Sequence, residues 1–265
     1  MTIAGPSHKT TDMTTDPIFD VRDKAVLITG GSRGLGLQMA HGFAARGANV
    51  IIASRKLAAC EEVAAELRET YGIDSGAYAC NVSEWSQCDD LMAVVHERFG
   101  QLDVLVNNAG LSPLYPSLDK LEEALFDKVI GVNLRGPFRL SVLAGTKMAE
   151  GRGGSIINIT STQSIKPRPH ALPYAAAKAG LNAVTEGLAH AFGPTVRVNA
   201  ILCGPFLTEV AEAWDMEEFE ERAQRTMALQ RGGRPEEIVG AALYYASDAS
   251  SFATGAVLRL DGGYV

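Results

Sequence analysis

The stretch Val26-Leu-Ile-Thr-Gly-Gly-Ser-Arg-Gly-Leu-Gly36 joins an apolar run to a glycine-rich turn, and a helical stretch follows from Leu37. A strand that passes through glycines into a helix is typical of a phosphate site. The glycines let the backbone approach the ligand, and the helix N-terminus offers free N–H groups. The glycine spacing is GxxxGxG. The residues predicted to bind the pyrophosphate of a dinucleotide are Gly30, Ser32, Arg33, Gly34, Leu35 and Gly36.

Short apolar runs recur along the rest of the chain, with helical periodicity between them. The runs that we expect to form strands are 25–29, 49–54, 75–80, 104–106, 155–160, 196–202 and 256–260. They are rich in Val and Ile and do not alternate with polar residues, which favours a parallel sheet buried on both faces. The alternation predicts a single-domain α/β protein over 21–265, a Rossmann-type doubly wound parallel sheet of about seven strands in three α/β/α layers. Residues 1–20 are predicted to form a disordered tail.

The composition excludes several classes of protein. The 265 residues carry 24 Lys and Arg against 31 Asp and Glu, which argues against non-specific nucleic-acid binding. No apolar run reaches the roughly 18 residues of a membrane span, and no signal-peptide pattern is present. Four cysteines without a CxxC motif and five histidines without ligand spacing favour reduced thiols and no metal. We therefore expect a cytoplasmic protein with a small-molecule substrate and no nucleic-acid or membrane partner.

The same turn also spells the G-x-S-x-G motif of the α/β-hydrolase nucleophile elbow, with Ser32 as the nucleophile. In hydrolases several strands precede that serine, whereas one predicted strand precedes Ser32 here. Gly36 also fits a pyrophosphate better than it fits a nucleophile. A serine hydrolase is therefore the remote alternative.

The end of the second predicted strand favours one form of the dinucleotide. Sites that prefer NAD carry an acidic residue near this point, which binds the ribose 2′-hydroxyl. Here Ser54 and Arg55 stand in that place, and Arg33 lies in the glycine turn. Two guanidinium groups suit a 2′-phosphate, which a carboxylate would repel. We predict that Ser54 and Arg55 contact NADP(H), with NAD(H) as the weaker alternative.

Candidate catalytic residues follow the fourth and fifth predicted strands. Asn107-Asn-Ala-Gly110 follows the fourth strand, and the fifth strand ends at Ser161. The carboxyl ends of parallel strands face the ligand crevice of a doubly wound sheet. Tyr174 and Lys178 lie four residues apart in a predicted helix, so they share one helix face.

Together these motifs resemble the short-chain dehydrogenase/reductase family over about residues 22–263. The motifs that carry the resemblance are Thr29-Gly30-x-x-x-Gly34-x-Gly36, Asn107-Asn-Ala-Gly110, Asn133, Ser161, Tyr174-x-x-x-Lys178, Arg197-Val-Asn199-Ala, Arg234-Pro-Glu-Glu-Ile238 and Asp261-Gly-Gly263. The resemblance implies hydride transfer between a nicotinamide and a ketone or secondary alcohol, with proton exchange at Tyr174 and charge stabilisation by Ser161. It implies that Lys178 holds the nicotinamide ribose and that Asn133 holds a water in a proton path to that lysine. We expect the Lys178 cation to lower the pKa of Tyr174.

The resemblance also extends the cofactor site. The residues it adds are Asn81, Val82, Asn108, Ala109, Gly110, Tyr174, Lys178, Gly204, Pro205 and Phe206. Asn81 replaces the usual aspartate beside the adenine, and its amide oxygen can still accept a hydrogen bond from the adenine amino group. Cys203 replaces the usual proline near the nicotinamide edge, and we favour a packing role for it over a catalytic or redox role.

The substrate side carries weaker signals. In the family, the segment 205–228 is a lid over the substrate. The predicted substrate-pocket residues are Ser112, Thr162, Gln163, His170, Cys203 and Trp214. These positions mix apolar, hydroxyl and amide groups, and no clamp for a phosphate or carboxylate is evident.

Within the family, the chain resembles both 3-oxoacyl-carrier-protein reductases and sugar or polyol dehydrogenases. The former need basic residues near the site entrance, for which Arg152 is the candidate. The family implies a homotetramer. The prediction is an NADP-preferring oxidoreductase with a Ser-Tyr-Lys mechanism, and the alternative from another class is a catalytically silent NADP-binding regulatory protein.

Overall fold

Seven parallel strands form one sheet in the order β3-β2-β1-β4-β5-β6-β7. The computed structural model describes residues 16–209, 211 and 214–264. The strands are β1 (Ala25–Thr29), β2 (Asn49–Ser54), β3 (Ser75–Ala79), β4 (Val104–Asn107), β5 (Gly154–Ser161), β6 (Val196–Cys203) and β7 (Val257–Leu260). Each begins and ends within one residue of its predicted run, which confirms the predicted Rossmann-type sheet. Residues 1–15 of the predicted tail lie outside the described residues, and Pro17–Phe19 forms a short 3-10 helix.

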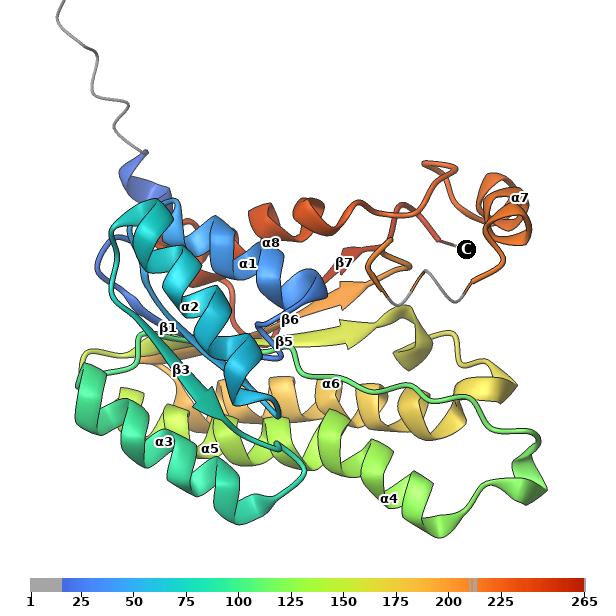
Figure 1. Cartoon of the computed structure of the whole chain (residues 1–265), viewed down its shortest axis with the longest axis horizontal. Coiled ribbons are helices and arrows are strands. Elements are labelled where there is room, and N and C mark those ends of the chain that lie inside the picture. Colours follow the sequence, from blue (N-terminus) through green and yellow to red (C-terminus); the bar gives the residue numbers. More distant parts are fainter. Residues whose placement is uncertain (1–15, 210, 212–213, 265) are drawn as a thin grey trace, which may run out of the picture.

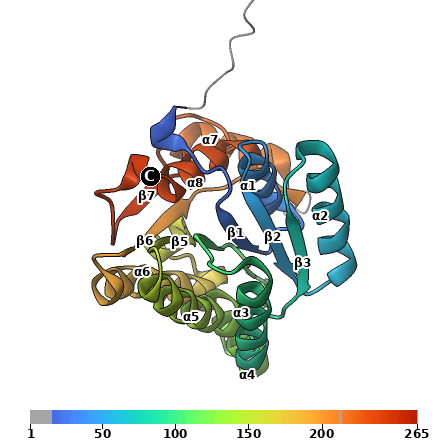
Figure 2. The ribbon, with the colours of Figure 1, turned by 90° about the vertical axis from the view of Figure 1, so that its left-hand side faces the viewer.

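Helices cover both faces of the sheet (Figure 2). They are α1 (Gly34–Ala44), α2 (Leu57–Tyr71), α3 (Trp85–Phe99), α4 (Glu123–Ile130), α5 (Gly136–Glu150), α6 (Leu172–Phe192), α7 (Met216–Thr226) and α8 (Val239–Ala246). Helices α1, α2 and α8 pack on one face, and α3, α5 and α6 pack on the other. This arrangement is the predicted three-layer architecture.

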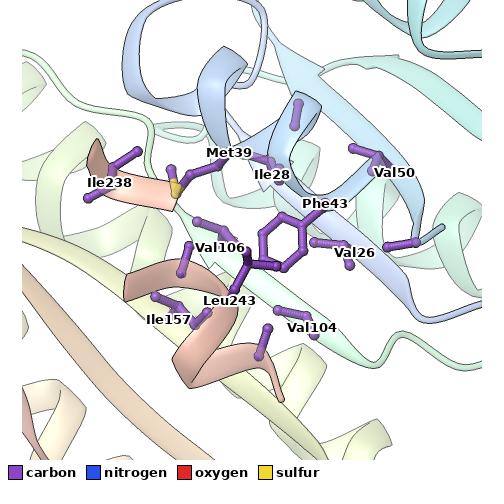
Figure 3. Close-up of a cluster of buried hydrophobic side chains, with 14 of the residues drawn as sticks. Val26, Ile28, Met39, Phe43, Val50, Val104, Val106, Ile157, Ile238 and Leu243 are labelled. Carbon is purple, nitrogen blue, oxygen red and sulfur yellow. The ribbon is translucent and has the colours of Figure 1, made fainter. Parts of the chain in front are cut away.

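The core on the α1 face explains why the apolar runs form buried strands. All five residues of β1 are buried. Phe43 and Met39 of α1 pack with Leu243 of α8 over Ile28 of β1 and Val106 of β4 (Figure 3). Burial of each such side chain stabilises the fold by roughly 1.5–3 kcal/mol. This core fixes the start of α1 against the end of β1.

The strand order reverses direction at β1, which pairs with β2 on one side and with β4 on the other. In an open α/β sheet, ligands bind at the carboxyl ends of the strands beside such a switch point. Figure 1 shows β5, β6 and β7 ending toward α7. In the described ranges, no helix has both the length and the apolar character to cross a membrane.

Candidate active site

Backbone contacts hold the turn between β1 and α1. Gly30 and Gly34 have positive φ angles of 65° and 55°, a conformation that favours glycine. Asn108, directly after β4, donates from Nδ2 to the carbonyl oxygens of Thr29 and Gly30 at 3.0 and 3.1 Å. A Cβ atom at Gly36 would lie 2.3 Å from the Gly30 carbonyl oxygen and 2.6 Å from Asn108 Nδ2. The turn therefore has no room for a side chain at Gly36.

A cavity of about 450 Å³ lies between the first turn of α1 and the segment after β6. Its lining residues are Gly34, Gln38, Leu207, Thr208, Glu209, Ala211, Met216 and Pro235. Gly34 donates its N–H to Glu209 Oε1 at 3.3 Å, so this helix N-terminus already attracts a negative charge. The glycine backbone, the helix N-terminus and the cavity together fit a dinucleotide phosphate.

Sequence reasoning missed Thr208 and Glu209 as residues of this cavity. A usable signal was present, because β6 ends at the same edge of the sheet as the glycine turn. The residues that follow β6 therefore reach the first turn of α1.

The end of β2 lies beside the glycine turn, as predicted for the 2′-phosphate region. Ser32 donates its hydroxyl to Ser54 Oγ at 3.2 Å, which joins the turn to the end of β2. Arg33 and Arg55 are exposed, and among the described residues neither forms a salt bridge. In the same part of the chain Ser32 contacts no histidine or carboxylate that would activate it as a nucleophile. This region fits an anion and gives no support to the hydrolase alternative.

On the predicted adenine side, the hydrogen bonds of Asn81 differ from those that we expected. Asn81 Oδ1 accepts hydrogen bonds from the Ser83 N–H at 3.3 Å and from the Ser83 hydroxyl at 2.9 Å. A carbonyl oxygen has two lone pairs, so this local turn occupies the acceptor that we expected to face the adenine amino group. Val82 is buried and accepts a hydrogen bond from the Cys88 thiol at 3.5 Å.

The segment after β4 is joined to β1 through Thr29. The backbone N–H groups of Asn108 and Ala109 each donate to Thr29 Oγ1 at 3.1 Å. The predicted cofactor residues on β4 and in the glycine turn are therefore held as one unit. Gly110 lies at the end of this unit, and a Cβ atom there would lie 3.3 Å from Asn133 Oδ1.

The structure brings Ser161, Tyr174 and Lys178 together. Ser161 ends β5, and Tyr174 and Lys178 share one face of α6. The Ser161 hydroxyl lies near enough to the Tyr174 hydroxyl to lower the pKa of Tyr174. The Nζ atom of Lys178 lies 5.7 Å from the centre of the Tyr174 ring and donates to the Ile159 carbonyl oxygen at 2.7 Å. A hydroxyl, a phenol and an amine therefore meet at the carboxyl end of β5.

Burial dominates the pKa values at this position. Tyr174 is half-buried, and desolvation of its hydroxyl raises its pKa to about 12, while the nearby Ser161 hydroxyl opposes this shift. Burial also lowers the pKa of Lys178 to about 8. The expected lowering of the Tyr174 pKa is wrong for the protein's own groups, because desolvation of the phenol dominates. Tyr174 is therefore protonated at neutral pH.

Asn133 lies in a π-helical turn, Gly131–Arg135, between α4 and α5. Its Nδ2 donates to the carbonyl oxygens of Leu111 and Val129 at 2.7 and 2.9 Å, and its Oδ1 accepts from the Leu111 N–H at 3.2 Å. The amide thus holds the segment after β4 against the helix, and within the described residues it makes no hydrogen bond to Lys178.

Cys203 and Gln163 lie directly beside Ser161. Strand pairing places Cys203 opposite Ser161, and the Gln163 N–H donates to Ser161 Oγ at 3.2 Å. Burial raises the pKa of Cys203 to about 12, so its thiol is protonated at neutral pH. An unionised thiol of this kind agrees with the packing role that we favour for Cys203.

The other predicted pocket residues are less closely gathered. Thr162 is buried directly after Ser161, whereas Ser112 and His170 are exposed on two different loops. The Trp214 ring lies 5.1 Å from the ring of Phe219 on α7. Sequence reasoning also missed Tyr115, whose hydroxyl contacts the backbone at Pro169 and Leu172, just before Tyr174.

The predicted lid contains α7 and a small apolar cluster. Phe219, Ala223 and Met227 are buried, with Leu207, Trp214 and Tyr264 packed against them. At the lid's start, the Gly204 N–H donates to Leu260, the Pro205 carbonyl accepts from Gly233, and Phe206 is buried. Residues 210 and 212–213 of the predicted lid lie outside the described residues.

The expectation that Arg152 lies near the site entrance is wrong. Arg152 precedes β5 and forms a salt bridge with Asp103, directly before β4, at 3.3 Å. Both residues are at the amino ends of parallel strands, the opposite edge of the sheet from Ser161.

Known proteins match this chain over most of its length. Residues 30–265 match the family model described as enoyl-(acyl carrier protein) reductase. A sorbose reductase of Schizosaccharomyces pombe is 35% identical over 93% of this chain and 98% of the relative. A 3-oxoacyl-[acyl-carrier-protein] reductase of Thermotoga maritima is 36% identical over 91% and 98%. A 5-keto-D-gluconate 5-reductase of Escherichia coli K12 is 34% identical over 93% and 97%.

Solved structures share the same fold. A 7α-hydroxysteroid dehydrogenase complexed with NADH and 7-oxo glycochenodeoxycholic acid has a TM-score of 0.89 and 29% identity, over 96% of this chain and 98% of that chain. An L-sorbose reductase of Gluconobacter frateurii complexed with NADPH and L-sorbose has a TM-score of 0.86 and 26% identity, over 93% and 98%.

Proposed function

Because the chain belongs to the short-chain dehydrogenase/reductase family, we propose that it is an NADP-preferring oxidoreductase acting on a ketone or secondary alcohol of a sugar or polyol. The observation that carries the proposal is the meeting of Ser161, Tyr174 and Lys178 at the carboxyl end of β5, on the same edge as the glycine turn. The nicotinamide, when bound, supplies or accepts the hydride. These three side chains supply the groups that act on the oxygen.

In the proposed mechanism, Tyr174 gives its proton to the carbonyl oxygen during reduction. Tyr174 is protonated at neutral pH and so has a proton to give, but its raised pKa makes it a weak acid in the protein without cofactor. Ser161 donates a hydrogen bond to the same oxygen and stabilises the charge that develops there. Lys178, held by the Ile159 carbonyl, would bind the ribose hydroxyls and place a positive charge near Tyr174.

The preference for NADP rests on the groups near Ser54. Arg33 and Arg55 are both exposed near the end of β2, and the sequence places no acid beside Ser54. Guanidinium groups bind phosphate in a bidentate manner, whereas the ribose 2′-hydroxyl of NAD is usually bound by a carboxylate. The sorbose reductase structure with NADPH supports this choice, and the steroid dehydrogenase structure with NADH represents the alternative.

The proposal includes the assembly and location that the family resemblance implies, a homotetramer in the cytoplasm. Light scattering should then give about four times the chain mass of 28.1 kDa. A mass equal to that of one chain would contradict this part of the proposal and leave the reaction unaffected.

An absorbance assay that follows the loss of NADPH or NADH tests the reaction. The protein is mixed with NADPH or NADH and with L-sorbose, 5-keto-D-gluconate, a steroid ketone or a ketoacyl thioester. We expect faster loss of NADPH than of NADH, and a fall in kcat of about 100-fold or more in Tyr174→Phe. Tyr78→Phe on β3, away from the site, is the matched control and should retain full activity.

Two outcomes would contradict the proposal. Full activity in Tyr174→Phe would rule out the proton donor, and faster turnover with NADH would rule out the role of Arg33 and Arg55. NADPH binding without turnover of any carbonyl compound would instead favour the silent regulatory protein.

A further inference from the structure

Three cationic side chains from two separate elements lie against Tyr264 and Phe219, which pack in the same apolar cluster. Lys166 and Arg168 lie on the loop between β5 and α6, and Arg222 lies on α7. The Lys166 Nζ and the Arg168 Cζ lie 5.9 and 5.6 Å from the centre of the Tyr264 ring. Arg168 also donates a hydrogen bond to the Tyr264 hydroxyl. We call Lys166, Arg168 and Arg222 the cation cluster.

The cation cluster brings three positive charges together in a chain with a formal net charge of −7. In the part of the chain that the structure describes, Lys166 and Arg168 form no salt bridge, and Arg222 has Glu218 at 3.8 Å. The pKa of Arg168 is lowered because burial desolvates its guanidinium, and the charge of Arg222 lowers it further. The two guanidinium groups therefore repel one another, and an anion bound between them would relieve that repulsion.

The backbone of Arg168 is linked to Ser161 through Gln163, and Arg222 lies against the lid. The Arg168 N–H donates to Gln163 Oε1 at 2.9 Å, and the Gln163 N–H donates to Ser161 Oγ at 3.2 Å. On the other side, the Arg222 Cζ lies 5.5 Å from the centre of the Phe219 ring, within the apolar cluster of the lid. An anion at this position would therefore border the substrate side of the site.

We propose that Arg168 and Arg222 bind the carboxylate of the substrate, so that the preferred substrate is a keto acid of the sugar class rather than a neutral ketose. This inference rests on the proposed function and names its substrate more closely. Arginine suits the role because its planar group pairs with both oxygens of a carboxylate. Half-burial of Arg168 strengthens such a contact by limiting the access of water.

An acidic carrier protein is a less suitable source of the negative charge. Helix α7 also carries exposed glutamates at positions 217, 218, 220 and 221. These carboxylates would repel an acidic protein surface, whereas a small carboxylate can pass between them to Arg168. A carrier-bound substrate is therefore an outcome of the test and not the proposal.

The test compares L-sorbose and 5-keto-D-gluconate as substrates of the wild type and of Arg168→Gln and Arg222→Gln. We expect KM for 5-keto-D-gluconate to rise about tenfold or more in Arg168→Gln, while KM for L-sorbose changes less than about twofold. The kcat values should change little, because neither arginine exchanges a proton with the carbonyl. Arg225→Gln, an exposed position on the same helix, is the matched control and should leave both KM values unchanged.

Several results would overturn the proposal. One is an unchanged KM for 5-keto-D-gluconate in Arg168→Gln, and another is an equal rise in KM for L-sorbose and 5-keto-D-gluconate. A third is reduction of a ketoacyl group only when it is attached to carrier protein. If the wild type reduces no ketone, the proposed function fails. The carboxylate site is then tested separately by the rise in Tm that a bound ligand causes. D-Gluconate, but not the neutral sorbitol, should raise the Tm of the wild type and should lose this effect in Arg168→Gln. Equal Tm values of the wild type with D-gluconate and with sorbitol would contradict the carboxylate site.

Discussion

The glycine turn and the cation cluster lie at the same edge of the sheet but are built in different ways. The turn, residues 30–36, is one continuous segment, held by contacts among backbone atoms and Asn108. The cation cluster joins two elements that are far apart in the sequence, because Lys166 and Arg168 lie against Tyr264, and Arg222 lies against Phe219 in the same apolar cluster. The glycine turn is thus specified by local backbone geometry, and the cation cluster by side chains that folding brings together.

This difference explains what a sequence reveals about each region. A turn that needs positive φ and a missing side chain restricts its residues to glycine, so its spacing is visible in the chain. An arginine on an exposed helix can serve solubility or binding equally well, and its sequence neighbours do not distinguish the two roles. The cofactor side is therefore easier to predict than the substrate side.

The largest expected effect follows from a side chain at Gly36. In Gly36→Ala, the new Cβ would lie 2.3 Å from the Gly30 carbonyl oxygen, so the turn or the start of α1 must move. We expect the Kd for NADPH to rise on the order of 100-fold, because this displacement disturbs the backbone that approaches the phosphates. Fluorescence titration with NADPH measures the change.

The control for this substitution is Gly187→Ala, in the exposed middle of α6. No atom lies within 4 Å of a Cβ built at Gly187. Alanine should stabilise this helix by about 0.5–1 kcal/mol and leave NADPH binding unchanged. Unaltered NADPH affinity in Gly36→Ala would show that the turn is not as constrained as the glycine spacing indicates.

A smaller effect should appear in the pH dependence, which tests whether Lys178 belongs to the cofactor side. The pKa of Lys178 is lowered to about 8, so its charge is present below that pH and is lost as the pH rises through it. We expect kcat/KM for NADPH, which reports the free enzyme, to be level below pH 8 and to fall about tenfold per pH unit above it.

Lys178→Arg provides the comparison, because a guanidinium keeps its charge over this range. This variant should lower the rate but remove the break near pH 8. A break at the same pH in both proteins would assign the titration to another group.

The strands and the glycine turn could be predicted from the sequence, because their signals are local. Continuous apolar runs gave each strand to within one residue, and the spacing from Ser161 to Tyr174 and Lys178 indicated their meeting. The Tyr174 pKa was predicted in the wrong direction because burial depends on all the packed elements. Arg152 lies away from the site because it precedes β5, and the amino ends of parallel strands lie at the opposite edge of the sheet from Ser161.

The smallest expected effect lies where the two regions meet. Glu209 belongs to the segment after β6, yet its carboxylate accepts the Gly34 N–H at 3.3 Å, at the N-terminus of α1. A dinucleotide phosphate near this N-terminus would meet a like charge. We therefore expect Glu209→Gln to tighten NADPH binding about two- to fivefold at low salt, with a smaller gain at high salt.

The stability of the protein without cofactor should change in the opposite direction. Loss of the negative charge removes a favourable interaction with the α1 dipole, so the Tm of Glu209→Gln should fall slightly. Glu221→Gln on α7 removes the same charge away from α1 and should alter neither value. Tighter binding with a lower Tm would show that the segment after β6 acts on the cofactor side through charge. Weaker binding would instead mean that Glu209 helps to hold the cofactor, and the division between the two regions would then lie beyond residue 209.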